Sequence, residues 1–226
     1  GARRAGSPAQ EGKNGLGIGM SEREPMRVDA DAAGDDRAAA DRLARLFRAA
    51  VAREREGIVA QAVAVYRALI ALDPTCAPAH ANLARILADR GEHGPAEAHC
   101  RRALELNPDH ADAHAVYGRL LVGRGETGAG IDRLRAAVRL DPLRPELHVL
   151  LGRALRAAGQ APGAETAFRR ALEIDPACGD ASAALGTLLM ATGRFEAARP
   201  VLAAGRQYAP AHAGVRAALG ACLLEL

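Results

Sequence analysis

The amino-acid sequence predicts an all-α fold, an α-solenoid in which antiparallel helix pairs stack along the chain. The first observation is a set of prolines that recurs every 34 residues, at Pro74, Pro108, Pro142, Pro176 and Pro210. The second is a set of glycines with the same spacing, at Gly57, Gly91, Gly125, Gly159 and Gly193. The third is the helical spacing of apolar residues between these markers. A fixed period of this length is typical of stacked helical repeats.

Each period predicts two helices separated by a glycine. In residues 77–90, Leu83 and Leu87 are four positions apart and share one helical face. Gly91 follows, where a helix end favours a residue that adopts the left-handed conformation. A second amphipathic stretch, residues 96–106, ends before Pro108, because proline cannot continue a helix and restricts the residue before it. The later periods repeat this plan.

Two further sets of positions hold small residues in almost every period. The first set is Ala50, Ala84, Gly118, Gly152, Gly186 and Gly220, and the second is Ala62, Ala96, Gly130, Ala164 and Ala198. They predict places where two helix backbones approach closely, so a large side chain at Gly118 or Gly152 should force neighbouring helices apart. A composition of 54 alanines and 24 glycines therefore suits a fold in which each helix pair buries its face against the next.

These positions together resemble the tetratricopeptide repeat (TPR). One whole unit of that pattern is present as Leu151, Gly152, Leu155, Ala164, Phe168, Ala171 and Pro176. The resemblance covers about residues 40–226 and implies a right-handed superhelix of five TPR units plus a sixth helix A. The expected units are 43–76, 77–110, 111–144, 145–178 and 179–212, with 213–226 as the partial sixth. Short stretches such as residues 101–108 (RRALELNP) also resemble the TPR arrays of O-linked glycosyltransferases and bacterial sulfotransferases.

Residues 1–36 are expected to form a separate, disordered N-terminal segment ahead of the array at 37–226. They are rich in Gly, Ser, Asp, Glu and Arg and show no periodicity. Within the array, the fifth unit places Pro200 inside its second helix, where proline removes a hydrogen bond and crowds the preceding turn. We expect that helix to be kinked or frayed at this point.

Composition and motifs argue against several classes of protein. No apolar stretch approaches about 18 residues, so no membrane span is expected. A net charge of +3 with 3% aromatic residues does not favour nucleic-acid binding. The cysteines lack metal-site spacing, and His80, His114 and His148 are expected to pack between adjacent helices. No catalytic constellation is legible, so we expect no enzyme activity, no metal and no cofactor.

The candidate binding site is a groove lined by the first helix of successive units, the surface that binds extended peptides in TPR arrays. Its most regular feature is the arginine ladder, Arg85, Arg119 and Arg153, whose guanidinium groups suit the carboxylates of an acidic segment. The alternative is a solvated face in which these arginines form local ion pairs with Asp112, Glu146 or Asp180. The predicted groove residues are Asn82, Arg85, Arg119, Arg153, Asp112 and Glu146.

The predicted function is a non-catalytic TPR scaffold that binds a protein or peptide through the concave groove of its first helices. The alternative is the TPR arm of a larger glycosyl- or sulfotransferase whose catalytic domain lies beyond residue 226. An apolar edge at Leu219, Leu223 and Leu226 also permits a homo-oligomer through the C-terminal helix. A single lysine among 30 basic residues is typical of a GC-rich genome, and no secretory signal opens the chain, so we expect a cytoplasmic bacterial protein.

Overall fold

The computed structural model describes residues 30–225, and this part of the chain contains eleven α-helices and no strand. Residues 40–226 form one compact unit, to which the packing described below belongs. The helices are α1 (Ala30–Arg55), α2 (Val59–Leu72), α3 (Ala77–Asp89), α4 (His93–Leu106), α5 (Ala111–Gly123), α6 (Thr127–Leu140), α7 (Pro145–Ala157), α8 (Ala161–Ile174), α9 (Gly179–Ala191), α10 (Phe195–Tyr208) and α11 (Ala213–Leu224).

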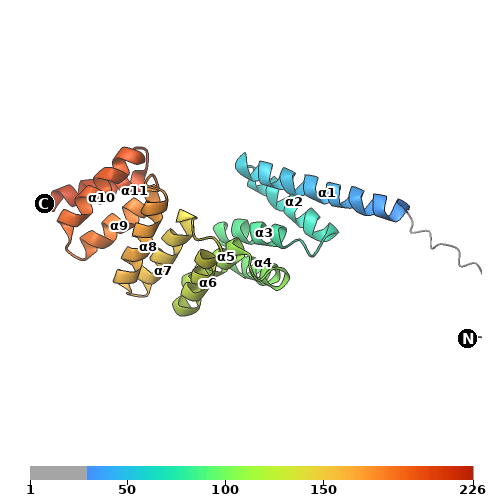
Figure 1. Ribbon diagram of the computed structural model, residues 1–226, viewed down its shortest axis with the longest axis horizontal. Helices are drawn as coiled ribbons and strands as arrows, with labels where there is room; N and C mark the ends of the chain where they lie inside the picture. Colours follow the sequence, from blue (N-terminus) through green and yellow to red (C-terminus); the bar gives the residue numbers. More distant parts are fainter. Residues whose placement is uncertain (1–29, 226) are drawn as a thin grey trace, which may run out of the picture. The chain divides into compact units, whose positions relative to one another are not determined.

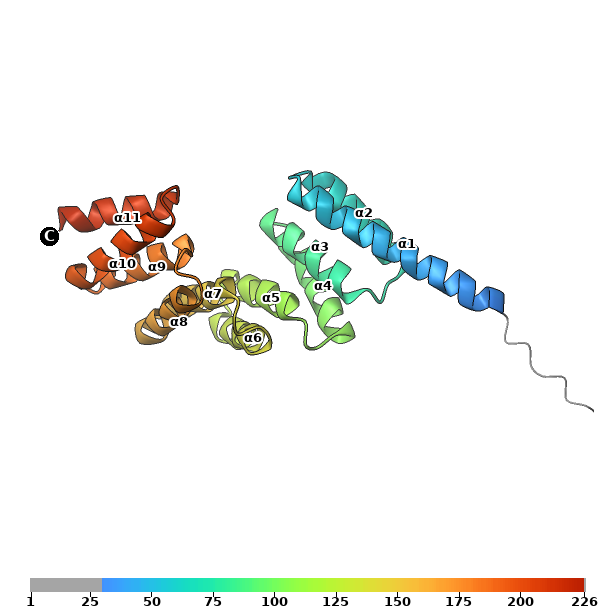
Figure 2. The ribbon, with the colours of Figure 1, turned by 45° about the horizontal axis from the view of Figure 1, so that its top comes forward.

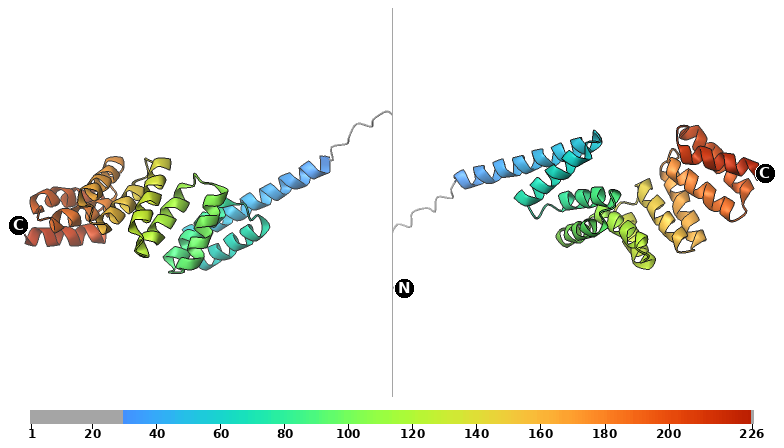
Figure 3. Two further views of the ribbon diagram at one scale, coloured as in Figure 1. Left: turned by 90° about the horizontal axis from the view of Figure 1, so that it is seen from below. Right: turned by 180° about the vertical axis from the view of Figure 1, so that it is seen from behind.

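The helices pack in chain order as antiparallel pairs (Figure 1, Figure 2). The pairs α3–α4, α5–α6, α7–α8 and α9–α10 correspond to the predicted units, and α11 is the single helix of the partial sixth. The second helix of each pair also contacts the first helix of the next pair, and first helices contact one another from α3 to α11. Views from below and from behind show the same order of pairs (Figure 3). The predicted all-α solenoid of helix pairs is therefore confirmed.

Helix boundaries follow the glycine and proline markers closely. The five glycines between paired helices have φ values of 73–89°, the left-handed conformation expected of them. Two boundaries differ from the prediction. Helix α4 begins at His93, three residues before residue 96. Helix α1 begins at Ala30, so residues 30–36 are helical although the segment 1–36 was expected to be disordered; residues 1–29 lie outside the described residues.

The fifth predicted unit was expected to have a kinked or frayed second helix at Pro200. Helix α10 is continuous from Phe195 to Tyr208 with Pro200 inside it, so the helix is not frayed at the proline. A proline inside a helix removes one backbone hydrogen bond and crowds the preceding turn. On this helix Leu202 is fully buried and packs into the same core as Leu185 and Leu189 of α9, which stabilises the turns after the proline.

Small residues lie where the helices of a pair approach one another. A Cβ atom added to Gly152 would lie 2.5 Å from Cε1 of Phe168, which is fully buried between α7 and its partner α8. At the same position on the last helix, a Cβ atom added to Gly220 would have nothing within 4 Å.

On helix α11, Leu223 and Leu224 are 56% and 88% exposed, whereas Leu219 is buried, contrary to the predicted apolar edge. Leu226 lies outside the described residues.

Candidate functional site

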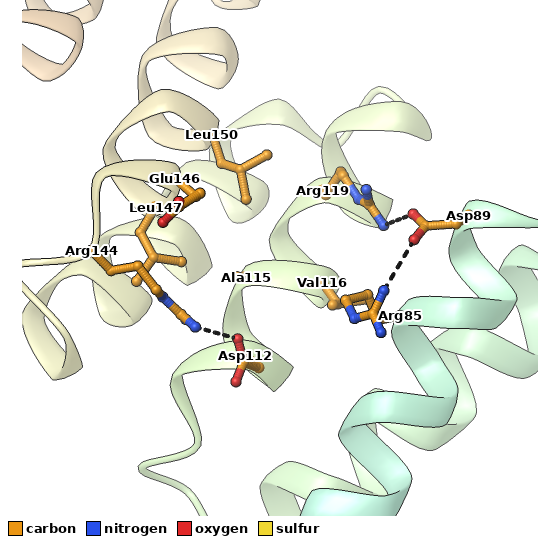
Figure 4. A pocket seen from close by; sticks show the side chains of 10 residues that line it. All are labelled: Arg85, Asp89, Asp112, Ala115, Val116, Arg119, Arg144, Glu146, Leu147 and Leu150. Carbon is orange, nitrogen blue, oxygen red and sulfur yellow. Dashed lines mark hydrogen bonds and ion pairs between the residues drawn. The ribbon is translucent and has the colours of Figure 1, made fainter. Parts of the chain in front are cut away.

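A pocket of about 250 Å³ opens between α3, α5 and α7, the first helices of three successive pairs (Figure 4). We call it the groove pocket. It contains four of the six predicted groove residues: Arg85, Arg119, Asp112 and Glu146. It is completed by Asp89, Ala115, Val116, Arg144, Leu147 and Leu150. The predicted Asn82 and Arg153 do not line it.

Helical periodicity explains why these side chains meet. On α5, Asp112, Ala115, Val116 and Arg119 are three or four residues apart, so they share one face of the helix. On α7, Leu150 lies one turn after Leu147 and faces the same space (Figure 4). Alanine, valine and leucine side chains form the wall, and charged groups surround it.

The arginine ladder is ion-paired within the chain. Arg119 Nη2 lies 2.6 Å from Oδ1 of Asp89, on the preceding first helix. Arg85 pairs with Asp89 at 3.5 Å and also with Glu54 of α1. Arg153 Nη2 donates to Asp180 Oδ1 at 2.5 Å, so Asp180 is the one partner of the ladder that sequence analysis anticipated. These arginines connect consecutive first helices.

The two predicted acidic residues have different surroundings. Asp112 Oδ1 accepts a hydrogen bond of 2.7 Å from Arg144, which lies in the connection before α7, and not from a ladder arginine. Glu146 lines the pocket and is exposed, and it forms no ion pair with any residue that the structure describes (Figure 4). The groove pocket thus holds one carboxylate without a cationic partner in the described chain.

Asn82 is partly buried on α3, outside the groove pocket. Its amide nitrogen donates to the Tyr66 hydroxyl at 3.0 Å. Tyr66 is fully buried, and burial, followed by the negative charge of Glu54, raises its pKa to about 12. The phenol therefore stays protonated and can donate to Glu54, 3.4 Å away. Asn82 thus connects α3 to α2 and does not line the groove pocket.

Two charged residues of the pocket, Asp89 and Arg144, were not predicted from the sequence. Asp89 follows Arg85 by four residues on α3, and this helical spacing is a signal that could have identified the pair. Arg144 precedes the first residue of α7 and does not belong to the arginine ladder, so no periodic pattern marks it.

The histidine set has a structural role in the connections between pairs. His80, His114 and His148 are 6–8% exposed, as expected for side chains packed between helices. The Nε2 atom of each lies near a backbone carbonyl oxygen six residues earlier, at 3.3, 2.8 and 3.0 Å from Pro74, Pro108 and Pro142. A carbonyl oxygen only accepts, so Nε2 carries the proton and donates. Each histidine thus fixes the loop that precedes its own helix.

Residues 30–225 contain no group of three or more His, Cys, Asp or Glu side chains arranged to hold a metal ion. No helix in the described part of the chain is long and apolar enough to cross a bilayer.

The stacked helix pairs and the pocket between their first helices define a helical-repeat protein of the kind that serves as an interaction scaffold. Two family models described as tetratricopeptide repeat match the sequence, one over residues 54–120 and 155–222 and the other over residues 115–177. The chain belongs to the tetratricopeptide repeat family. No curated protein sequence matches it.

Several solved structures share this fold. A thermophilic TPR protein in Thermus thermophilus is 21% identical, with a TM-score of 0.69, and the match covers 80% of this chain and 99% of that one. PilF of Pseudomonas aeruginosa is 20% identical, with a TM-score of 0.70 and coverage of 84% and 92%. YrrB is 21% identical, with a TM-score of 0.58 and coverage of 76% and 89%. At these identities the matches show the fold alone, and they add no support to the resemblance to transferase arrays.

Proposed function

We propose that this chain is a non-catalytic scaffold that binds an extended segment of a partner protein along its first helices, with the groove pocket as the central contact. The observation that carries the proposal is the pocket itself, because three successive repeats combine there to form an apolar wall surrounded by charged side chains. Binding sites commonly combine an apolar surface with a few convergent polar groups.

The charged surroundings of the pocket are held in place before any partner binds. Arg119 is paired with Asp89, and Arg144 with Asp112, so these ion pairs favour one orientation of each side chain before binding. Preorganisation of this kind lowers the entropic cost of association. The solved structure of YrrB is described as a TPR protein with an unusual peptide-binding site, which supports the view that this repeat fold can carry such a site.

The test is an affinity isolation from lysate of the source organism with the full chain and two variants. Leu150→Arg places a charged side chain in the pocket wall, where Leu150 is partly buried. Leu143→Arg makes the same substitution at a residue that is 69% exposed and lies outside the pocket. We expect specific partners to be retained by Leu143→Arg and lost with Leu150→Arg. Identical sets of partners for both variants would contradict the proposal.

We also propose that α11 mediates association with a second copy of the chain. The observation that favours it is the exposure of Leu223 and Leu224. Leu189 occupies the position of Leu223 in the preceding pair and is fully buried there beneath α10. An exposed apolar surface of this kind is typical of a protein–protein contact.

A further inference from the structure

We infer that the groove pocket receives a basic side chain of the partner, with the aliphatic stem on the apolar wall and the charged end at Glu146. This inference rests on the proposed function and adds the chemistry of the ligand. The arginine ladder in the sequence predicted an acidic ligand instead. The basic ligand follows from the ion pairs that the charged side chains of the pocket already form.

The two ladder arginines of the pocket already have acidic partners. Asp89 lies 2.6 Å from Arg119 and 3.5 Å from Arg85, so one carboxylate serves two guanidinium groups, and Arg85 also pairs with Glu54 (Figure 4). An acidic ligand would have to displace these partners or approach them closely. Both routes carry an electrostatic cost, because like charges repel and a displaced carboxylate loses its counter-ion.

The third arginine of the pocket is also unsuited to recruiting an anion. Arg144 donates to Asp112 at 2.7 Å through Nη1, and its Nε lies 3.4 Å from Asp141. Its Nε and Nη2 atoms are buried and make no hydrogen bond with the described residues. Because these atoms are shielded from solvent, a ligand cannot reach them without rearrangement of the pocket.

Glu146 differs from the residues at the same position in the neighbouring units. Asp112, Glu146 and Asp180 are each 34 residues apart, and each lies in the first turn of its helix, where a carboxylate stabilises the positive end of the helix dipole. Asp112 pairs with Arg144 and Asp180 pairs with Arg153. Glu146 alone of the three forms no ion pair with the described residues. Its charge is therefore available to a cation from outside.

The size and wall of the pocket suit one long side chain. Its volume of about 250 Å³ is below the roughly 300–1,000 Å³ of pockets that enclose a drug-sized ligand. Val116, Leu147 and Leu150 provide an apolar wall next to Glu146. Lysine and arginine commonly place their methylene groups on such a surface while the charged end meets a polar group.

The experiment selects ligands from a phage-displayed library of random 12-residue peptides on the full chain. Peptides that bind the wild type but not Leu150→Arg are synthesised, and affinities are measured by fluorescence anisotropy. We expect these peptides to share a lysine or arginine beside an apolar residue. Replacing a shared lysine by norleucine keeps most of the aliphatic stem and removes the charge. For a shared arginine, citrulline serves the same purpose.

A double-mutant cycle then tests the contact with Glu146 directly. Removing the ligand charge should weaken binding to the wild type about tenfold, and it should have little effect on Glu146→Gln. Glu173→Gln, an exposed carboxylate on α8, is the matched control and should behave like the wild type. Circular dichroism of each variant confirms that it is folded.

The alternative outcomes separate the two proposals. Selected peptides that depend on acidic residues and on Arg85 or Arg119 would overturn the inference and keep the proposed function. Basic peptides that bind to the Glu146→Gln variant as tightly as they bind to the wild type would also overturn the inference and keep the proposed function. A selection that yields no peptide sensitive to Leu150→Arg would overturn both.

Discussion

Gly118 and Gly130 face each other across the α5–α6 pair at backbone contact distance. A Cβ atom added to Gly118 would lie 2.9 Å from the carbonyl oxygen of Gly130, and one added to Gly130 would lie 2.8 Å from the carbonyl oxygen of Gly118. Both distances are below the separation at which non-bonded carbon and oxygen atoms normally pack. This crossing therefore depends on the absence of a side chain on either helix.

We expect Gly118→Ala to destabilise the protein by about 1–3 kcal/mol, because the added methyl group meets backbone atoms that cannot move independently. Gly123→Ala on the same helix is the matched control, since a Cβ atom there would have nothing within 4 Å. That substitution should leave the stability unchanged or raise it by up to about 1 kcal/mol through helix propensity. Urea unfolding followed by circular dichroism measures both. Equal changes in stability for the two variants would show that helix propensity, and not the close contact at Gly118, determines the effect of the substitution.

Most of the fold follows from the sequence because short-range rules determine it. Gly91 and Pro108 end their helices for local steric reasons, so their positions in the sequence predict boundaries that the structure confirms. The structure differs from the sequence prediction where contacts between helices determine the conformation. Pro200 lies inside a continuous helix whose later turns bury Leu202, and the steric rule for proline alone does not predict this continuity.

The sequence predicted where the pocket lies, but not which acidic side chain pairs with which arginine in it. Helical spacing alone indicates that Arg119, Asp112 and Val116 share a face of one helix. Which carboxylate meets Arg119 depends on how α3 and α5 lie relative to each other, and Asp89 lies there rather than Asp112. Side-chain partners between helices require the tertiary arrangement, so the charge balance of the site emerges only from the structure.

The stability of the array should fall as the pH drops below neutrality. His80 Nδ1 lies 2.9 Å from His99 Nδ1, and burial lowers the pKa of both imidazoles, as it does for His110. Above pH 6.5, near the usual histidine pKa, these groups are neutral in both states and stability is complete. Below it the unfolded chain takes up protons first, so the free energy of unfolding decreases until the folded pKa values are passed.

Urea unfolding at pH 7.5 and pH 5.5 measures this dependence. The wild type should lose stability between the two values, and His99→Gln should lose less, because it removes one group whose pKa is lowered by burial and by the neighbouring His80. A loss that is as large in His99→Gln as in the wild type would assign the effect to other groups.

Cys76, Cys100 and Cys178 should differ in reactivity toward iodoacetamide at pH 8. Burial raises the pKa of Cys100 to about 12, and the side chain is fully buried, so almost no thiolate is present or accessible. Cys76 and Cys178 are partly exposed, and burial raises their pKa values as well. We expect slow labelling of these two in the folded protein and labelling of Cys100 only in urea. Mass spectrometry of tryptic peptides gives the rates, and labelling of folded Cys100 as fast as Cys178 would contradict the packing of α4.

The exposed face of α11 leads to a prediction about assembly. Burying a leucine side chain contributes roughly 1.5–3 kcal/mol, so Leu223→Glu should weaken self-association at least tenfold. Leu72→Glu is the matched control, because Leu72 on α2 is 52% exposed, close to the 56% of Leu223, and lies far from α11 in the sequence. Light scattering across a concentration series should show concentration-dependent assembly for the wild type and Leu72→Glu and a monomer for Leu223→Glu. If the wild type remains a monomer at the highest concentration, α11 does not mediate self-association and its leucines have another role.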